Sequence, residues 1–362
     1  MDRTLTRAAD ERINWLSSLP FLLFHAVPVL AVVTGVTWRA VAIFVTLYTV
    51  RMFAISAGYH RYFSHRSYRT NRPVQLALAL IGASAAQKGP LWWAANHRAH
   101  HRYSDTEQDV HSPQKGFWWS HVGWILCNRY KAADLDLVRD LAAFPELRFV
   151  ERYNSVVPWI LGGLSLLIGG WSGLVFGFFG STVLLWHVTF TINSLSHTFG
   201  TRRFATSDTS RNNPVLAVLT FGEGWHNNHH HYPAAARQGF YWWELDVSWY
   251  ALRGLAALRL VGALRRPSAA VLERNRLHDG VFDLGMFRAA WRRAGAAVAN
   301  SRTSLGTPIA AAANLVSSRQ AALEAAIHAQ RVALEEAVTA SLRAAEDLTR
   351  ATKLAGRSAP SS

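Results

Sequence analysis

The sequence predicts an all-α integral membrane protein with four transmembrane helices, arranged as two hairpins, and a cytosolic helical cap. Half of the 362 residues are apolar and only 17% are charged. Residues 19–58 contain two charged residues and residues 155–200 contain none. Each stretch is long enough for two helices of about 20 residues, the length that spans a bilayer. Three histidine-rich clusters lie at the ends of these stretches or beyond them.

The first hairpin is predicted over 19–36 and 39–58, after a basic cytosolic segment at 1–18. It is too long for the apolar core of a signal peptide, and the second span follows the first directly. Arg51 falls within the second span, where we expect its side chain to snorkel to the cytosolic interface rather than pair inside.

Residues 74–95 are also apolar, but Gly89 and Pro90 interrupt them. If this segment crossed the membrane, His97 would lie on the opposite side from His60. We therefore expect an interfacial or re-entrant segment within the first part of the cap, residues 59–155. Membrane helices and this part of the cap together occupy 19–200.

The second hairpin is predicted at 158–170 and 171–193, joined by a glycine-rich turn. Both hairpin turns lack charge whereas the flanking segments are basic, which places the histidine clusters in the cytosol. Residues 201–290 form the second part of the cap. Residues 291–362 form an alanine-rich tail, in which about 308–350 predict an amphipathic helix or coiled-coil arm that is dispensable for the chemistry.

The net charge of +15 lies mainly outside the predicted spans. Basic segments next to spans fix orientation and contact anionic lipid headgroups, so we do not expect nucleic-acid binding. The single cysteine, Cys127, excludes an internal disulfide and a cysteine-ligated iron–sulfur cluster.

The histidine clusters predict a metal site. They read HRYFSH from His60, HRAHH from His97 and HNNHHH from His226. In a helix, the first, fourth and fifth positions of the second and third clusters share one face. His60 and His65 are five residues apart, so we expect the helix to end or unwind between them. One such cluster alone is more often surface or packing chemistry, but three exceed the needs of one tetrahedral ion and indicate two metals with nitrogen ligands.

Other polar residues are weighed against structural roles. Asn193 lies four residues before His197, and a water-bridged contact to the site and a helix–helix hydrogen bond remain equal alternatives. His187, His25 and His121 are interpreted mainly as hydrogen-bonded interior residues, and His231 as a neighbour of the ligands. Four nearby carboxylates can orient imidazole rings: Asp105, Glu107, Asp109 and Glu223.

An imidazole-rich site beside an aromatic, apolar interior suits oxidation of a lipid chain. An unactivated C–H bond requires a metal-bound oxidant made from dioxygen, and zinc cannot change its oxidation state. Iron is therefore favoured. A membrane metal-binding or transport protein is the alternative of another class, but its histidines would lie at mid-bilayer.

The motifs HRYFSH, HRAHHRYSDTEQDVHSP, GFWWSHVGW, NSLSHTFG and GEGWHNNHHHYP occur in this order. Over residues 20–250 the chain resembles the membrane fatty acyl desaturases, in particular the group that includes acyl-CoA delta-9 desaturases. The resemblance implies a four-span fold with a bent acyl tunnel, contact of Asn193 with the site through water, and two irons held by nine histidines: His60, His65, His97, His100, His101, His197, His226, His229 and His230.

The implied reaction inserts a cis double bond, expected at delta-9, into a saturated acyl chain. Dioxygen is the co-substrate, and a separate electron-transfer protein or reductase supplies electrons. Acyl-CoA is the expected carrier, with acyl carrier protein and an intact membrane lipid left open. An acyl hydroxylase shares the histidine clusters and remains the alternative within the class.

Two groups of residues are expected to contact the substrate. The tunnel is expected to be shaped by Trp93, Trp186, Thr189 and Phe190. The phosphates of coenzyme A are expected to meet Arg72, Lys88, Arg202, Arg203 and Arg211. Phe190 stands where the family often has Trp, which leaves the shape of the tunnel and the double-bond position open.

Overall fold

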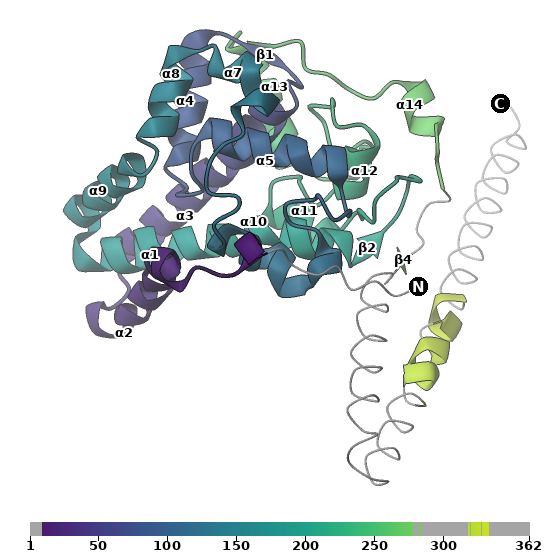
Figure 1. Cartoon of the computed structure of the whole chain (residues 1–362), viewed down its shortest axis with the longest axis horizontal. Coiled ribbons are helices and arrows are strands. Elements are labelled where there is room, and N and C mark those ends of the chain that lie inside the picture. Colours follow the sequence, from purple (N-terminus) through teal and green to yellow (C-terminus); the bar gives the residue numbers. More distant parts are fainter. Residues whose placement is uncertain (1–8, 278–281, 284–317, 319, 327, 333–362) are drawn as a thin grey trace, which may run out of the picture. The chain divides into compact units, whose positions relative to one another are not determined.

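The computed structural model describes residues 9–277, 282–283, 318, 320–326 and 328–332 (Figure 1). The chain divides into two compact units, Met1–Arg288 and Ala289–Ser362. The first unit contains all the histidine clusters, and its regular secondary structure is almost entirely helical. In the second unit the described residues between 318 and 332 are helical, and Leu323 and Val332 are exposed. Most of the amphipathic helix expected at 308–350 lies outside the described residues.

The first apolar segment forms α1 (Trp15–Ala26), a 3-10 turn (Val27–Leu30) and α2 (Ala31–Thr34). Gly35, with φ 69°, turns the chain into α3 (Trp38–Phe53). Glycine adopts this left-handed conformation without the steric cost that a Cβ atom brings. The turn lies where the sequence predicts it.

The helix continues beyond α3 as a π-helix, Ala54–Ser64, so that the apolar run Trp38–Ser64 is 27 residues long. A π-helix pairs each residue with the one five positions away. His60 and His65, which caps the C-terminus, are separated by this interval. The helix widens into this π-helix and then ends at Ser64, between the two histidines as expected, and the two rings lie 5.0 Å apart.

Arg51 is buried inside the helical bundle, with 1% of its surface exposed. Its guanidinium donates to Thr182 Oγ1 at 2.7 Å, to Ser181 Oγ at 2.6 Å and to the Leu47 carbonyl at 2.9 Å. The expected snorkelling is wrong, because neutral oxygens on α10 satisfy the charge within the protein. Arg51 thereby ties α3 to the start of α10.

The second apolar segment comprises α9 (Val156–Ser172), a π-helix (Gly173–Gly180), α10 (Ser181–Ser194) and a 3-10 turn (Leu195–His197). Gly170, with φ 62° and ψ −159°, breaks the helical geometry within α9. A Cβ atom on Gly173 would lie 2.4 Å from the Ser165 carbonyl oxygen. The chain therefore folds back at Gly170, and the residues on either side pack closely.

The described residues contain three helical runs long and apolar enough to cross a membrane: Trp15–Thr34, Trp38–Ser64 and Val156–His197. Large apolar side chains on these runs are exposed, for example Val32 at 89% and Leu167 at 83%. Outward-facing apolar residues on such helices are typical of contact with lipid. The protein is accordingly a membrane protein.

Short helices build the rest of the first unit. α4 (Arg72–Ala83) is about 18 Å long, too short to span a bilayer. α5 (Pro90–Tyr103) begins where the Glu151 carboxylate accepts the backbone N–H groups of Leu91 and Trp92, at 2.8 and 3.1 Å. The other α-helices are α6 (Trp124–Leu126), α7 (Arg139–Ala142), α8 (Pro145–Arg152), α11 (Pro214–Leu219), α12 (His226–His231), α13 (Val247–Ala257) and α14 (Ala269–Glu273).

Two antiparallel strand pairs join distant segments of the chain. The pairs are β1 (Arg69–Thr70) with β3 (Val261–Gly262), and β2 (Gly200–Thr201) with β4 (Phe282–Asp283). The remaining short helices are a π-helix (Trp119–Gly123) and 3-10 turns at Ala9–Glu11, Pro113–Lys115 and Leu135–Val138. β1 follows the first histidine cluster in the chain, and β2 follows His197.

Candidate metal centre

The structure gathers nine histidines from four elements into two adjacent groups. The five-histidine group comprises His60, His65, His97, His101 and His229, and the four-histidine group comprises His100, His197, His226 and His230. In each group, one ring nitrogen per residue lies within 4.8 Å of all the others. These are the nine residues that the sequence predicts as ligands. The two groups interleave because α5 and α12 each contribute to both.

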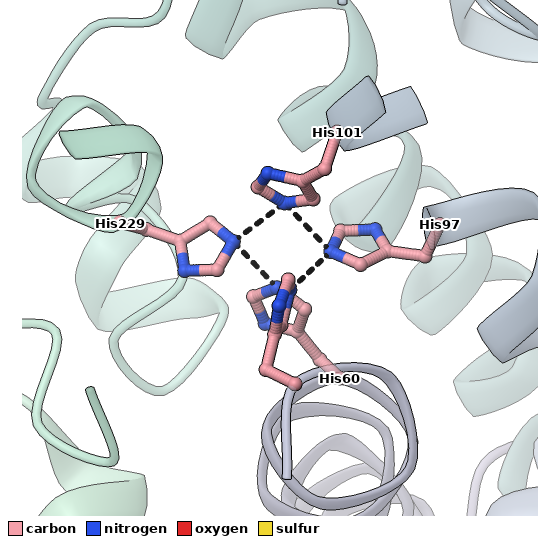
Figure 2. A group of neighbouring side chains, drawn as sticks. His60, His97, His101 and His229 are labelled. Atoms are coloured by element: carbon pink, nitrogen blue, oxygen red, sulfur yellow. Dashed lines mark hydrogen bonds between the residues drawn. The ribbon is translucent and has the colours of Figure 1, made fainter. Parts of the chain in front are cut away.

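The five-histidine group directs Nε2 atoms toward a common centre (Figure 2). His229 Nε2 lies 3.0 Å from that of His60 and 2.8 Å from that of His101. His97 Nε2 lies 3.0 Å from that of His101 and 2.8 Å from that of His65. A neutral imidazole carries one N–H, which can point at one neighbour only, so a series in which one Nε2 atom meets two others leaves lone pairs facing each other. A cation at the centre removes this conflict.

The four-histidine group also contains ring nitrogens that face one another or lack a hydrogen-bond partner. His197 Nε2 and His226 Nε2 are 3.0 Å apart. The Nε2 atoms of His100 and His230 are buried without a hydrogen-bond partner. Leaving buried polar atoms unpaired is costly unless an ion or another group meets them. Converging, unpartnered imidazole nitrogens fit a divalent transition metal.

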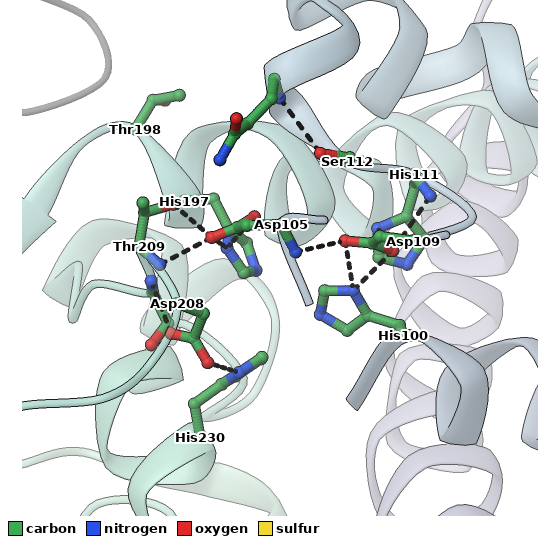
Figure 3. Close-up of polar contacts among 12 residues, drawn as sticks. His100, Asp105, Asp109, His111, Ser112, His197, Thr198, Asp208, Thr209 and His230 are labelled. Atoms are coloured by element: carbon green, nitrogen blue, oxygen red, sulfur yellow. Dashed lines mark hydrogen bonds and ion pairs between the residues drawn. The ribbon is translucent and has the colours of Figure 1, made fainter. Parts of the chain in front are cut away.

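Buried carboxylates contact the Nδ1 atoms of three of the four histidines in this group (Figure 3). His100 Nδ1 lies 3.0 Å from Asp109, His197 Nδ1 lies 3.2 Å from Asp105, and His230 Nδ1 lies 2.6 Å from Asp208. A carboxylate accepts a hydrogen bond from Nδ1–H, which fixes the tautomer and leaves the Nε2 lone pair available. Each ring is therefore oriented as a metal ligand from outside the group.

His60 in the five-histidine group has a comparable partner, because its Nδ1 contacts Glu223. Arg61, which is fully buried, donates from Nε to Glu223 at 3.1 Å and from Nη1 to Asp246 at 3.0 Å. Two carboxylates thus surround one guanidinium, as buried charges require. This ion cluster connects the π-helix to the Glu223 loop and to the start of α13.

The protonation states also suit metal binding. Burial raises the pKa of Asp105, but His197 and hydrogen bonds from Thr209 outweigh burial and lower it to about 2. Burial likewise opposes ionisation of Glu223, yet His60 and Arg61 lower its pKa to about 2. These carboxylates are ionised at neutral pH.

Three imidazoles of the five-histidine group are shifted in the sense that keeps them neutral, whereas burial of His197 is outweighed by Asp105, which raises the pKa of that ring. Burial, together with neighbouring histidines, holds the pKa of His97, His101 and His229 well below the usual value of 6.5. A neutral imidazole is the form that binds a metal. Ionised carboxylates and neutral rings are therefore both present at pH 7.

Sequence reasoning missed two residues of this network. Asp208 contacts His230 from a loop whose composition gave no signal. His111 is buried with its ring 4.2 Å from that of His100, and it forms a further group of possible ligands with His100 and Asp109. Its position two residues after Asp109 is the signal that could have identified it. By contrast, Glu107 is exposed, and His231 stacks on Phe204 and contacts the Val271 carbonyl, away from both groups.

Lowering the pH from 7 to 5 should destabilise the metal-free protein partly through His111. Burial lowers the pKa of His111 to about 3, with His100 acting in the same direction. Between about pH 6.5 and pH 3 the unfolded chain therefore binds a proton that the folded protein does not. The unfolding free energy consequently decreases as the pH is lowered, by up to roughly 1.4 kcal/mol per pH unit. Thermal unfolding in detergent should show a shallower pH dependence for His111→Asn than for the unsubstituted protein. An equal slope would show that His111 does not titrate in this way.

A cavity of ≈ 370 Å³ adjoins the histidine groups. The four residues predicted to shape a tunnel, Trp93, Trp186, Thr189 and Phe190, all line it. Asn193 and four of the nine histidines line it as well, His60, His97, His100 and His226. The lining is mainly aromatic and apolar, so the cavity can hold a hydrocarbon chain beside the candidate metal centre.

The five cations predicted to meet coenzyme A do not gather at this cavity. Lys88 lines it, with Nζ donating to the Lys131 carbonyl at 2.6 Å. Arg72 pairs with Glu146, and Arg203 with Glu244. Arg202 donates to the carbonyls of Thr206 and Asp208, and Arg211 is 2% exposed. None of the four arginines lines the cavity, because each is engaged elsewhere in the cap.

Comparison with known proteins identifies the class. A sequence profile of the fatty acid desaturase family matches residues 36–267. The chain belongs to this family and is an oxidoreductase, a fatty acyl desaturase.

Curated relatives show which members it is similar to. The "sn-1 stearoyl-lipid 9-desaturase" of Anabaena variabilis is 39% identical over 260 residues, which cover 71% of this chain and 96% of that protein. The "Delta-9 acyl-lipid desaturase 1" of Arabidopsis thaliana is 37% identical, covering 71% and 85% respectively. The "Acyl-CoA C20 Delta5-desaturase" of Anemone leveillei is 36% identical, covering 64% and 76%.

Proposed function

We propose that the protein uses dioxygen to insert a cis double bond, at delta-9, into a saturated acyl chain of a membrane lipid. Two irons held by the nine histidines would supply the oxidant needed to break an unactivated C–H bond. The observation that carries this proposal is that both histidine groups meet one apolar cavity that begins among the membrane helices. A hydroxylase would share the histidines, but the relatives named above are all desaturases.

The mouth of the cavity favours a lipid over acyl-CoA, the carrier expected from the sequence. Its exposed lining residues include Ser17 and Pro20 at the start of α1, and Ser155 and Trp159 at the start of α9. These are the ends of two apolar helices, where a lipid headgroup would lie. Among the described lining residues Lys88 is the only lysine or arginine, whereas coenzyme A carries several phosphates. A glycerolipid chain can enter here directly from its leaflet.

The protein itself positions the substrate and excludes water. Trp93, Trp186 and Phe190 form rigid walls of the cavity. A cavity of fixed shape can select one methylene on an acyl chain that carries no polar groups to distinguish its positions. Gln87 donates to Thr189 at 3.1 Å and so closes the wall between the α4–α5 loop and α10. Asn193 lies beside the metal groups, where we propose that it contacts them through water.

Four membrane spans follow if the run Val156–His197 crosses twice, turning at Gly170. All three histidine clusters then lie on one side, which the basic flanks place in the cytosol. Desaturation takes two electrons from the substrate and two from a donor to reduce dioxygen to two waters. With Cys127 as its only cysteine, the chain has no thiolate cluster for that purpose. We propose a separate electron-transfer protein docking on the basic face.

Product analysis tests this function. Purified, iron-loaded protein in lipid nanodiscs should receive dioxygen, a reducing system and either a saturated phosphatidyl lipid or the matching acyl-CoA. We expect a cis-monounsaturated chain on the lipid, by mass spectrometry with double-bond localisation. Hydroxylated chains would favour the alternative chemistry. Conversion of acyl-CoA with untouched lipid would contradict the proposed carrier.

Changing Phe190 should change the product. Phe190 is 6% exposed and lines the cavity, so Phe190→Ala lengthens or widens it and Phe190→Trp fills it. We expect a shift in chain-length preference or double-bond position with both variants. Phe149→Ala, at an exposed phenylalanine on α8, is the matched control. Unchanged product profiles in both Phe190 variants would show that this residue does not shape the bend.

A further inference from the structure

Three histidines outside the metal groups form a separate hydrogen-bonded series, here termed the histidine chain: His25 on α1, His187 on α10 and His121 in the Trp119–Gly123 π-helix. His25 Nε2 and His187 Nε2 are 2.8 Å apart, and His187 Nδ1 and His121 Nε2 are 3.0 Å apart. At one end His25 Nδ1 lies 2.7 Å from the Phe21 carbonyl, and at the other His121 Nδ1 lies 3.0 Å from Ser194 Oγ.

The proton positions follow from the Phe21 carbonyl, which can only accept. His25 must carry its proton on Nδ1, so its Nε2 accepts from His187 Nε2–H. His187 Nδ1 then accepts from His121 Nε2–H. The Ser194 hydroxyl has one proton, which can be donated either to His121 Nδ1 or to the Phe190 carbonyl. When it is donated to His121, one proton per ring satisfies every link and all three imidazoles are neutral. Burial and the neighbouring His187 lower the pKa of His121 to about 4, in agreement with this state.

The ends of the chain argue against proton transport. His25 ends on a carbonyl of its own helix, and the Ser194 hydroxyl also lies 3.0 Å from the Phe190 carbonyl. In the described part of the protein, no hydrogen bond leads from this series to an ionisable group beyond it. The links therefore join α1, α10 and the Trp119–Gly123 π-helix without connecting them to a proton donor.

The histidine chain lies directly behind the cavity wall. Trp186 and Phe190, which line the cavity, flank His187 along α10. The Trp186 ring stacks on Phe21 at 5.2 Å and lies 5.8 Å from His25. The Phe190 ring meets His121 edge-on at 5.9 Å and lies 6.2 Å from His187. The three histidines themselves are absent from the lining, so they touch the wall from outside.

We propose that the histidine chain positions the acyl tunnel wall, with His187 as the residue that sets which methylene faces the metal centre. The inference rests on the proposed desaturase function. Because His187 binds α1 through one nitrogen and the Trp119–Gly123 π-helix through the other, it fixes the position of α10, which carries Trp186 and Phe190, relative to both elements. A displacement of about 1 Å at reacting atoms can change a rate about 100-fold, so small shifts of this wall alter the product.

Substitution of His187 tests the proposal with matched variants. His187→Leu removes both links at similar volume, His187→Asn places an amide near Nδ1, and His187→Gln places one near Nε2. We expect His187→Leu to lower the ratio of main to minor double-bond isomers, or of preferred to other chain lengths, several-fold at unchanged iron content. The amide variants should recover part of this selectivity. His328→Ala, at an exposed position, is the control.

A double substitution separates this role from general packing. His25→Leu should shift the profile in the same direction as His187→Leu, and the pair should shift it no further than the larger single effect, because both break one series. An unsubstituted protein that yields no unsaturated product would defeat the proposed function itself. Normal desaturation with the same isomer profile in His187→Leu and His25→Leu, or a purely additive double variant, would overturn only the positioning role. Loss of iron in His187→Leu and in both amide variants would also overturn it.

Discussion

Replacing His100 or His229 with alanine should abolish desaturation and reduce the iron content. His229 belongs to the five-histidine group and His100 to the four-histidine group, so each substitution removes one converging nitrogen. Even the loss of an outer hydrogen-bond partner costs 10–100-fold in metal affinity or activity, so loss of a ligand should cost more than ~100-fold. Iron per chain and product formation should be measured on the same anaerobically purified samples.

His328→Ala is the matched control, because this histidine is exposed and belongs to neither group. It should keep both the iron and the activity. Full activity with full iron content in either His100→Ala or His229→Ala would show that this residue is not a ligand.

Asp208→Ala should lower iron affinity by about 10–100-fold without changing any ligand. Asp208 is buried and holds His230 Nδ1 at 2.6 Å, and the imidazole outweighs burial to hold the pKa of this carboxyl well below its usual range. Without the carboxylate, the proton of His230 is free to occupy Nε2 and block the lone pair that faces the centre. Competition with a chelator of known affinity would give the change.

The matched control for this substitution is Asp136→Ala, since Asp136 is 77% exposed and pairs only with Arg139 three residues away. An exposed pair of this kind contributes little. Iron affinity in Asp208→Ala equal to that in Asp136→Ala would show that His230 needs no outer carboxylate to act as a ligand.

Six of the nine converging histidines could be predicted from local spacing, because within α5 and α12 they follow the helical repeat. The complete set of nine, which includes His197, was implied by the family resemblance. The sequence also locates the turns at Gly35 and Gly170, where glycine permits the backbone geometry. The π-helix at 54–64 could not be predicted in this way, since its wider repeat is selected by packing and by the need to align His60 with His65.

Contacts between distant segments were the least predictable. Arg51 finds its acceptors about 130 residues away, at Ser181 and Thr182, and Asp208 meets His230 only through the folding of a loop. Arg72 looked available for an anionic substrate, yet it pairs with Glu146, 74 residues away. Composition shows that a charge is present, but only the fold shows whether it is already paired.

The most direct test of the account is an anomalous diffraction map at the iron absorption edge, from crystals of the iron-loaded protein. We predict two iron peaks per chain, one within the five-histidine group and one within the four-histidine group, each surrounded by Nε2 atoms. A single peak, or a peak held by His100, Asp109 and His111 with the five-histidine group empty, would contradict the proposed centre.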